Sequence, residues 1–125
     1  MSSPPDWAVD FVREARVARL ATANAGAEPH VIPCVYVLHD GAIYSVIDEK
    51  PKSGRRLLRL RNIDATGRAA LVVDHYDDDW TQLAFVLIRG WPRRSPPTIH
   101  AIHRRWMRYG RSIPSTARWN WIIRR

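Results

Sequence analysis

The sequence predicts a small α+β domain, a mainly antiparallel β-barrel with flanking helices. Two observations support this prediction. A helical segment, three strand-like runs joined by short turns, a second helical segment and a further strand follow one another along the chain. The chain also contains no Gly-x-Gly-x-x-Gly or Walker motif of the kind found in parallel α/β nucleotide-binding domains. Its 125 residues suit one domain whose core gains support from a partner subunit.

The first helix is expected to begin at Asp6, because an aspartate cap accepts hydrogen bonds from the unpaired amides of a helix N-terminus. Trp7 and Phe11 lie on one helical stripe and are predicted to face the core. A short strand over Val17 to Thr22 follows, and Asn24-Ala25-Gly26 supplies turn residues after it.

The second and third strands are predicted to form a hairpin. Pro29 to Leu38 is rich in β-branched and aromatic residues, and Ile43 to Ile47 continues this pattern. Asp40-Gly41 between them suits the positive φ angles of a tight turn. Pro33 has no N–H group, so the strand is expected to lie at an edge or to contain a bulge there.

A second helix is predicted from about Ser53 to Ile63, with Leu57 and Leu60 buried and its arginines facing water or a ligand. The nearly continuous apolar run Ala69 to Asp74 then predicts another strand. An acidic turn follows this strand. It is interpreted as solvated rather than as a cation site.

Charge divides the chain at one point. All 12 acidic residues lie at or before Asp79, whereas the 20 basic residues split into ten up to Arg68 and ten from Arg89 onward. The first part therefore carries 10 − 12 = −2 and the remainder +10, which together give the net charge of +8. A change this abrupt predicts a boundary between residues 1–83 and an atypical basic tail over residues 84–125.

The composition argues against several classes of protein. The single cysteine, Cys34, excludes an internal disulfide framework and fits a reducing compartment. No signal-peptide pattern and no apolar stretch of membrane-spanning length occurs, so a soluble, cytoplasmic protein is expected. The histidines lack the spacing of a ligand set, so no metal site is predicted, and no serine has an evident base beside it.

A basic segment between the third strand and the second helix is the first candidate site. Lys50, Lys52, Arg55 and Arg56 converge there, and a helix N-terminus favours anions because its first amides lack intrahelical partners. These groups are able to hold a phosphate or carboxylate tail. The alternative is a solvated basic loop, and charge alone does not separate the two.

Several ordered runs over about residues 7–83 then carry a resemblance to a known family. The runs are Phe11–Thr22, Glu28–Pro33, Asp48–Lys52, Arg55–Leu57, Arg59–Ile63 and Leu71–Asp77 with Trp80. Together they resemble the pyridoxamine 5′-phosphate oxidase-like split-barrel proteins, and most closely the actinobacterial branch of coenzyme F420 (deazaflavin)-dependent enzymes.

The resemblance implies an FMN-binding-like split β-barrel that forms a homodimer, with a flavin-type ring in a groove at the subunit interface. Backbone groups around Pro33, Cys34 and Val35 are then expected to face the ring, and the four cations of the basic segment to hold the phosphate-bearing tail. An edge-strand bulge is the structural alternative at Pro33–Val35. Tyr76 and Trp80 are expected to pack in the core, with contact to the ring as the alternative.

The implied chemistry is hydride transfer to or from a small organic substrate. The cofactor performs it while the protein supplies orientation and water exclusion, so no catalytic residue is named. Coenzyme F420 rests on the family resemblance, and FMN is the alternative because both need an anion site and a ring slot. A non-catalytic split barrel that binds FMN, haem or another planar ligand is the competing function.

The resemblance ends after Leu83, and the barrel is expected to be incomplete at its C-terminal end. One reading of the arginine- and tryptophan-rich remainder is a nucleic-acid-binding appendage. The preferred reading is a change of reading frame, because in the shifted frame Trp106-Met107 encodes aspartate and Trp119 to Ile122 encodes Glu-Leu-Asp. One base lost or gained near the codons for Leu83 to Phe85 is the prediction that follows.

Overall fold

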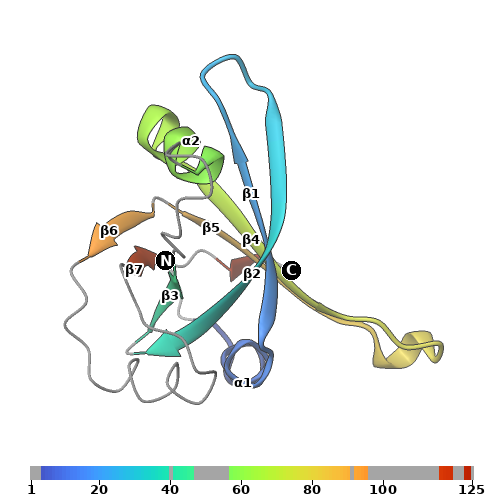
Figure 1. Ribbon diagram of the computed structural model, residues 1–125. Coiled ribbons are helices and arrows are strands. Elements are labelled where there is room, and N and C mark those ends of the chain that lie inside the picture. Colours follow the sequence, from blue (N-terminus) through green and yellow to red (C-terminus); the bar gives the residue numbers. More distant parts are fainter. Residues whose placement is uncertain are drawn as a thin grey trace.

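The computed structural model describes residues 4–39, 41–46, 57–90, 92–95, 116–119 and 123–124. In these residues the elements are α1 (Asp6–Glu14), β1 (Val17–Ala23), β2 (Pro29–His39), β3 (Ala42–Val46), α2 (Leu58–Thr66), β4 (Ala69–His75), the short 3-10 helix η1 (Trp80–Gln82), β5 (Ala84–Gly90), β6 (Arg93–Ser95), β7 (Thr116–Trp119) and β8 (Ile123–Arg124). The strands form one sheet in the order β6-β7-β3-β2-β1-β4-β5-β8, and its pairings are antiparallel (Figure 1). The predicted α+β class is confirmed.

Helix α1 starts one residue earlier than a cap at Asp6 requires, so that prediction is wrong. Pro5 is the N-cap residue, because its extended backbone (φ −64°, ψ 149°) lets its carbonyl accept hydrogen bonds from Ala8 and Val9. Asp6 is therefore the first helical residue, where its negative charge still suits the helix dipole. Ala8 and Val12 are the fully buried residues of this helix.

Strand β2 is paired on both sides along only part of its length. It pairs with β1 from Val17↔Val35 to Ala23↔Pro29, but its described ladder with β3 spans only Tyr36 to His39. Pro33 therefore faces β1 on one side and has no described strand partner on the other. Among the described residues, Pro33 therefore has the edge position that was one of the two alternatives expected for it.

Helix α2 lies further along the chain than predicted. Leu57 has an extended backbone (φ −57°, ψ 138°) and is the N-cap, so the predicted start at Ser53 is wrong. The helix ends at Gly67, which adopts a left-handed conformation (φ 68°) that glycine reaches without steric cost. Leu60 and Asn62 are buried, whereas Leu57, expected in the core, is only half-buried.

We expect Gly67→Ala to lower the unfolding free energy by about 1 kcal/mol, because alanine, unlike glycine, is strained in the left-handed backbone conformation. No atom lies within 4 Å of the added Cβ, so the cost is conformational rather than steric. Gly26→Ala is the matched control, since Gly26 does not have a positive φ and its added Cβ meets only Asn24 Oδ1 at 3.4 Å. Urea unfolding measures both, and equal losses would contradict this account.

The core lies between α1 and one face of the sheet. Its largest fully buried side chains come from one helix and three strands, and they are Val12, Ile43, Leu71, Val73, Val86 and Ile88. Tyr36 fixes the helix to the sheet, because its buried hydroxyl donates a hydrogen bond to the Val12 carbonyl at 2.6 Å. Helix α1 contacts both β2 and β5, and it lies below the sheet in Figure 1.

Strands β4 and β5 form a hairpin that continues the sheet past Leu83. Their register runs without interruption from Ala69↔Gly90 to His75↔Ala84. The far end of this hairpin extends away from the body of the domain and carries η1 at its tip (Figure 1). Asp79 caps η1 by accepting hydrogen bonds from the amide and hydroxyl of Thr81, and these bonds lower the pKa of its exposed carboxyl.

Candidate functional site

The predicted cationic segment lies outside the described residues, which include none of Lys50, Lys52, Arg55 and Arg56. The described helix that follows it has an end suited to an anion. The first turn of α2 contains no acidic residue, and its N-cap makes no side-chain hydrogen bond. The first amides to bond back to Leu57 are those of Leu60 and Arg61, so the amides before them point beyond the helix. This end of α2 therefore favours negative charge.

The second predicted segment, Pro33 to Val35, lies on the edge part of β2. Pro33 and Val35 are exposed, while Cys34 points to the other side and is half-buried. Burial raises the pKa of the Cys34 thiol, and a hydrogen bond with Ser45 and the charge of Arg59 oppose this shift. Arg59, in the first turn of α2, is thus close enough to β2 to act on it electrostatically. The first turn of α2 therefore lies on the Cys34 side of β2, opposite the exposed side chains of Pro33 and Val35.

The exposed side of β1, β2, β4 and β5 is largely apolar. The apolar residues of this outer face are Val17, Ala21, Ala23, Pro29, Val31, Pro33, Val35, Ala70, Val72, Phe85 and Leu87. Val31 is 65% and Phe85 is 52% exposed. An ion pair of 2.7 Å between Arg19 and Asp74 crosses the face, and both side chains are about half exposed. An apolar patch over four strands is typical of a surface that another molecule covers.

The aromatic side chains of the projecting hairpin do not enter the core. Tyr76 is 69% and Trp80 is 73% exposed, so the interpretation that they pack in the core is wrong. The reason is the projection of the hairpin, which carries both residues away from the helices and the sheet body (Figure 1). Contact with a second molecule remains open to them.

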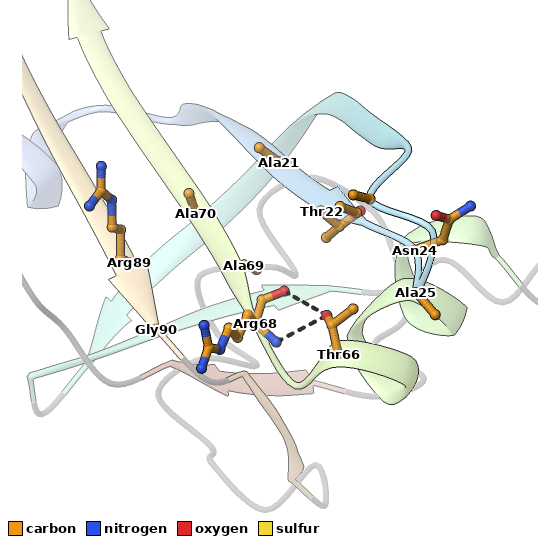
Figure 2. A pocket seen from close by; sticks show the side chains of 12 residues that line it. Ala21, Thr22, Asn24, Ala25, Thr66, Arg68, Ala69, Ala70, Arg89 and Gly90 are labelled. Atoms are coloured by element: carbon orange, nitrogen blue, oxygen red, sulfur yellow. Dashed lines mark hydrogen bonds between the residues drawn. The ribbon is translucent and has the colours of Figure 1, made fainter.

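A cavity of about 680 Å³ lies at the end of the sheet near the C-terminal end of α2 (Figure 2). Half of its described lining is alanine, and the lining residues are Ala21, Thr22, Ala23, Asn24, Ala25, Ala27, Thr66, Arg68, Ala69, Ala70, Arg89 and Gly90. This cavity was not among the sites predicted from the sequence. Its only signal was the density of alanine at 21–27 and 69–70, and the register that brings Arg89 opposite Ala70 is not visible in the sequence.

The uncharged polar side chains of this alanine-lined cavity are already bonded within the protein. Thr22 accepts a hydrogen bond from the buried Asn62 at 3.0 Å, and the Thr66 hydroxyl donates to the Asn62 carbonyl at 2.9 Å. The Asn24 side chain accepts from the Glu28 amide and donates to the Glu28 carboxylate. These bonds hold the walls of the cavity in place.

No metal site is built by the described part of the chain, where no group of three or more His, Cys, Asp and Glu side chains converges. His75 and Asp77 form a loose pair at 3.7 Å on the surface. Within the same residues, no helix has both the length and the apolar character needed to cross a membrane.

Neither a family model nor a curated protein matches this sequence. Solved structures do match its fold. A FAD-binding protein from Mesorhizobium loti superposes with a TM-score of 0.66 and 20% identity, covering 90% of this chain and 84% of that one. HutZ, a haem storage protein from Vibrio cholerae, gives 0.65 at 12% identity, with 94% and 87% covered. A candidate pyridoxamine 5′-phosphate oxidase from Corynebacterium glutamicum gives 0.63 at 12%, with 95% and 89% covered.

These likenesses cover 84–89% of the length of each matched protein. Identities of 12–20% are those of a shared fold rather than of a shared activity. The fold expected from the sequence runs is confirmed. The chain has the split β-barrel fold of the pyridoxamine 5′-phosphate oxidase-like proteins.

Proposed function

We propose that the chain binds a flavin-type cofactor as a homodimer and acts as a coenzyme F420-dependent oxidoreductase on a small organic substrate. One observation supports this proposal above the others. At Pro33 to Val35, strand β2 presents apolar side chains on its outer face and Cys34 on the other, where the charge of Arg59 in the first turn of α2 acts on the thiol. A planar ring with an anionic tail needs this combination of an apolar face and a positive terminus. FAD binding by the Mesorhizobium loti protein, which has the same fold, agrees with it.

The backbone of β2 supplies the polar part of the ring site. Between Pro29 and Val35 the described strand has a partner only on the β1 side, so its other edge carries backbone groups open to a ligand. Pro33 contributes no N–H group to this edge, and the Val35 carbonyl already accepts a hydrogen bond from the Ser45 hydroxyl at 3.2 Å. Pro33 and Val35 present apolar side chains on the outer face, which exclude water from a ring placed there.

The residues that bind the phosphate-bearing tail of the cofactor are assigned as Lys50, Lys52, Arg55 and Arg56, which precede the N-terminus of α2 in the chain. Charge-assisted hydrogen bonds to phosphate contribute roughly 1.5–3 kcal/mol each, so two or three are enough to anchor a cofactor. When bound, the deazaflavin supplies hydride transfer, and FMN is the alternative that fits the same anion site. The chain itself orients the ring and excludes water.

The homodimer is supported by two surfaces that this chain does not cover. The outer face exposes Val31, Val35 and Phe85, and the projecting hairpin exposes Tyr76 and Trp80. A second copy placed on the outer face buries these side chains and receives the hairpin of its partner. A groove formed between the two copies then encloses the ring.

We expect the double charge reversal Lys50→Glu and Lys52→Glu to weaken binding of coenzyme F420 by at least about a hundredfold, because two contacts to phosphate become repulsive. Titration followed by deazaflavin fluorescence measures this, with FMN titrated in parallel. Arg61→Glu is the matched control, since Arg61 is exposed on α2 beyond its first turn. Unchanged affinity in the double variant would remove the anion-site assignment, and turnover of reduced cofactor with unsaturated acceptors separates catalysis from binding.

A haem-binding barrel without redox turnover is the second candidate, favoured by the likeness to HutZ. Titration with hemin and observation of a Soret shift distinguishes it from flavin binding. The basic tail, to which nucleic-acid binding was assigned as an alternative, lies mostly outside the described residues.

A further inference from the structure

We propose that the alanine-lined cavity receives the tip of the projecting hairpin, residues 76–83, of a second copy of this chain. In a two-fold dimer each copy places its tip in the cavity of the other, so two equivalent contacts join the pair. This inference rests on the homodimer of the proposed function and names the surfaces through which the two copies hold one another.

The cavity lies at one end of the outer face. Arg89 pairs with Ala70 in the β4–β5 ladder, and Ala70 pairs with Ala21 of β1, so these residues share the outer side of the sheet. Figure 2 shows Ala21 and Ala70 on neighbouring strands of the lining. The hollow of about 680 Å³ lies within the range of roughly 300–1,000 Å³ found for binding pockets, so it accommodates a large aromatic side chain.

The tip presents the kind of side chain that anchors a protein interface. Tyr76 and Trp80 are 69% and 73% exposed, and the hairpin carries them away from the body of their own domain (Figure 1). Tryptophan and tyrosine contribute most to the affinity of an interface when a pocket of the partner encloses them. Trp80 is therefore assigned as the anchor of the tip.

The charges of the tip and of the cavity are opposite. The tip contains Asp77, Asp78 and Asp79 and has no lysine or arginine. The described lining of the cavity contains Arg68 and Arg89 and has no acidic residue. Opposite potentials favour contact between tip and cavity, whereas contact between two tips brings like charges together. The cavity of a second copy is therefore the favoured surface for the tip.

The tip and the cavity lie at opposite ends of one hairpin, and a two-fold axis brings such ends together. The cavity lies at the Ala69 end of β4, and the tip lies beyond its His75 end. Along the chain, residues 78–80 follow Asp74 by the same number of positions by which residues 68–70 precede it. An axis near Asp74, perpendicular to the strands and in the plane of the outer face, exchanges the two ends. Both contacts then form at once, as in dimers whose copies use the same surface.

The receiving surface is ordered before the partner binds. The buried bond from Asn62 to Thr22 ties α2 to β1, and the Asn24 amide closes the β1–β2 turn by donating to the Glu28 carbonyl at 3.1 Å. The Asn24 side chain also donates to the Glu28 carboxylate, so this acidic group is bonded within its own turn. Docking of the tip therefore requires little ordering of the cavity.

A complementation experiment with two variants of the full chain tests the contact. Trp80→Ser removes the anchor and leaves the cavity intact, whereas Ala70→Leu fills the cavity and leaves the tip intact. Each variant alone is expected to lose at least about a hundredfold in dimer affinity, because both contacts of its homodimer are damaged. An equal mixture of the two forms a heterodimer with one intact contact. Sedimentation equilibrium is expected to show this heterodimer to be at least about tenfold tighter than either homodimer.

Arg89→Glu is a second cavity variant, which removes the favourable charge without adding apolar bulk. It is expected to weaken the dimer by about tenfold and to be complemented by Trp80→Ser in the same way. Arg61→Glu is its control, because Arg61 is exposed on α2 outside the cavity lining, and it is expected to leave the dimer unchanged. Urea unfolding of each variant shows that a loss of dimer affinity is not a loss of the fold.

Three results overturn the inference, and they are a monomeric unaltered chain, a dimer that Trp80→Ser leaves unchanged, and a mixture no tighter than its components. Titration with coenzyme F420, followed by deazaflavin fluorescence on the same samples, separates the inference from the proposed function. Complementation by a chain that does not bind the cofactor supports the tip contact and refutes the cofactor. A dimer that binds the cofactor and does not need Trp80 refutes the tip contact alone.

Discussion

Replacement of Ile88 by alanine is expected to lower the unfolding free energy by about 3 kcal/mol, because deletion of three buried carbons leaves a cavity that the core fills only partly. Ile88 is fully buried, and it pairs with Leu71 of β4, which is only 1% exposed. Both side chains lie in the core cluster that includes Val12 of α1. The substitution therefore tests whether β5 is part of the folded core.

Leu58→Ala is the matched control for this prediction. Leu58 is 43% exposed on α2, and alanine is the best helix former, so the loss is expected to stay below about 1 kcal/mol. Urea unfolding followed by circular dichroism measures both variants. A loss at Ile88 no larger than that at Leu58 would contradict the placement of β5 in the core. Truncation after Leu83 is expected to unfold the protein, since it removes the partner strand of β4 along its whole length.

The pairing of β5 also shows how far the sequence determined the fold. Strands β1 and β2 were predicted almost to the residue, because their alternating apolar side chains and the turn residues between them are local signals. Strand β5 lies beyond the boundary predicted at Leu83. The sheet continues there because β5 pairs with β4 and buries the side chains of Val86 and Ile88. The boundary was predicted from the distribution of charged residues, which carries no information about strand pairing. A reading-frame change in the gene stays a prediction.

Helix α2 was placed too early for a different reason. Helical periodicity through Ser53 to Ile63 has no stop signal within it, whereas the structure ends the helix at Gly67 and begins it after Leu57. Periodic patterns identify helices better than they identify helix ends. An edge or a bulge was predicted at Pro33, because proline has no N–H group to donate to a neighbouring strand. The described ladder between β2 and β3 does not include this residue.

The alanine-lined cavity could not be predicted from the sequence. Its walls come from β1, the following turn, α2, β4 and β5, and alanine has no distinctive chemistry that marks a site. Arg68 and Arg89 are 21 positions apart, and both line the cavity only because β4 pairs with β5. Sites assembled from one segment, such as a basic run before a helix, are visible in a sequence, whereas sites assembled by strand pairing are not.

Replacement of Phe85 by lysine is expected to convert the proposed homodimer into a monomer, with a loss of dimer affinity of at least about a hundredfold. Phe85 is 52% exposed on the outer face, where burial of an unpaired ammonium against a second copy costs several kcal/mol. In the isolated chain a lysine there stays solvated and lies opposite Asp74, so the fold itself is not expected to suffer. Sedimentation equilibrium measures the change from twice the chain mass of 14.4 kDa to that mass.

Leu58→Lys supplies the control, because it adds the same charge at a leucine that is 43% exposed and lies outside the outer face. This variant is expected to remain dimeric. If both variants dissociate, added charge rather than its location is responsible, and if neither does, the outer face is not the interface. A dimer that survives Phe85→Lys but loses coenzyme F420 would instead assign the outer face to the ring alone. The apolar residues that cover four strands would then serve the cofactor, and the projecting hairpin would be the element that joins the two copies.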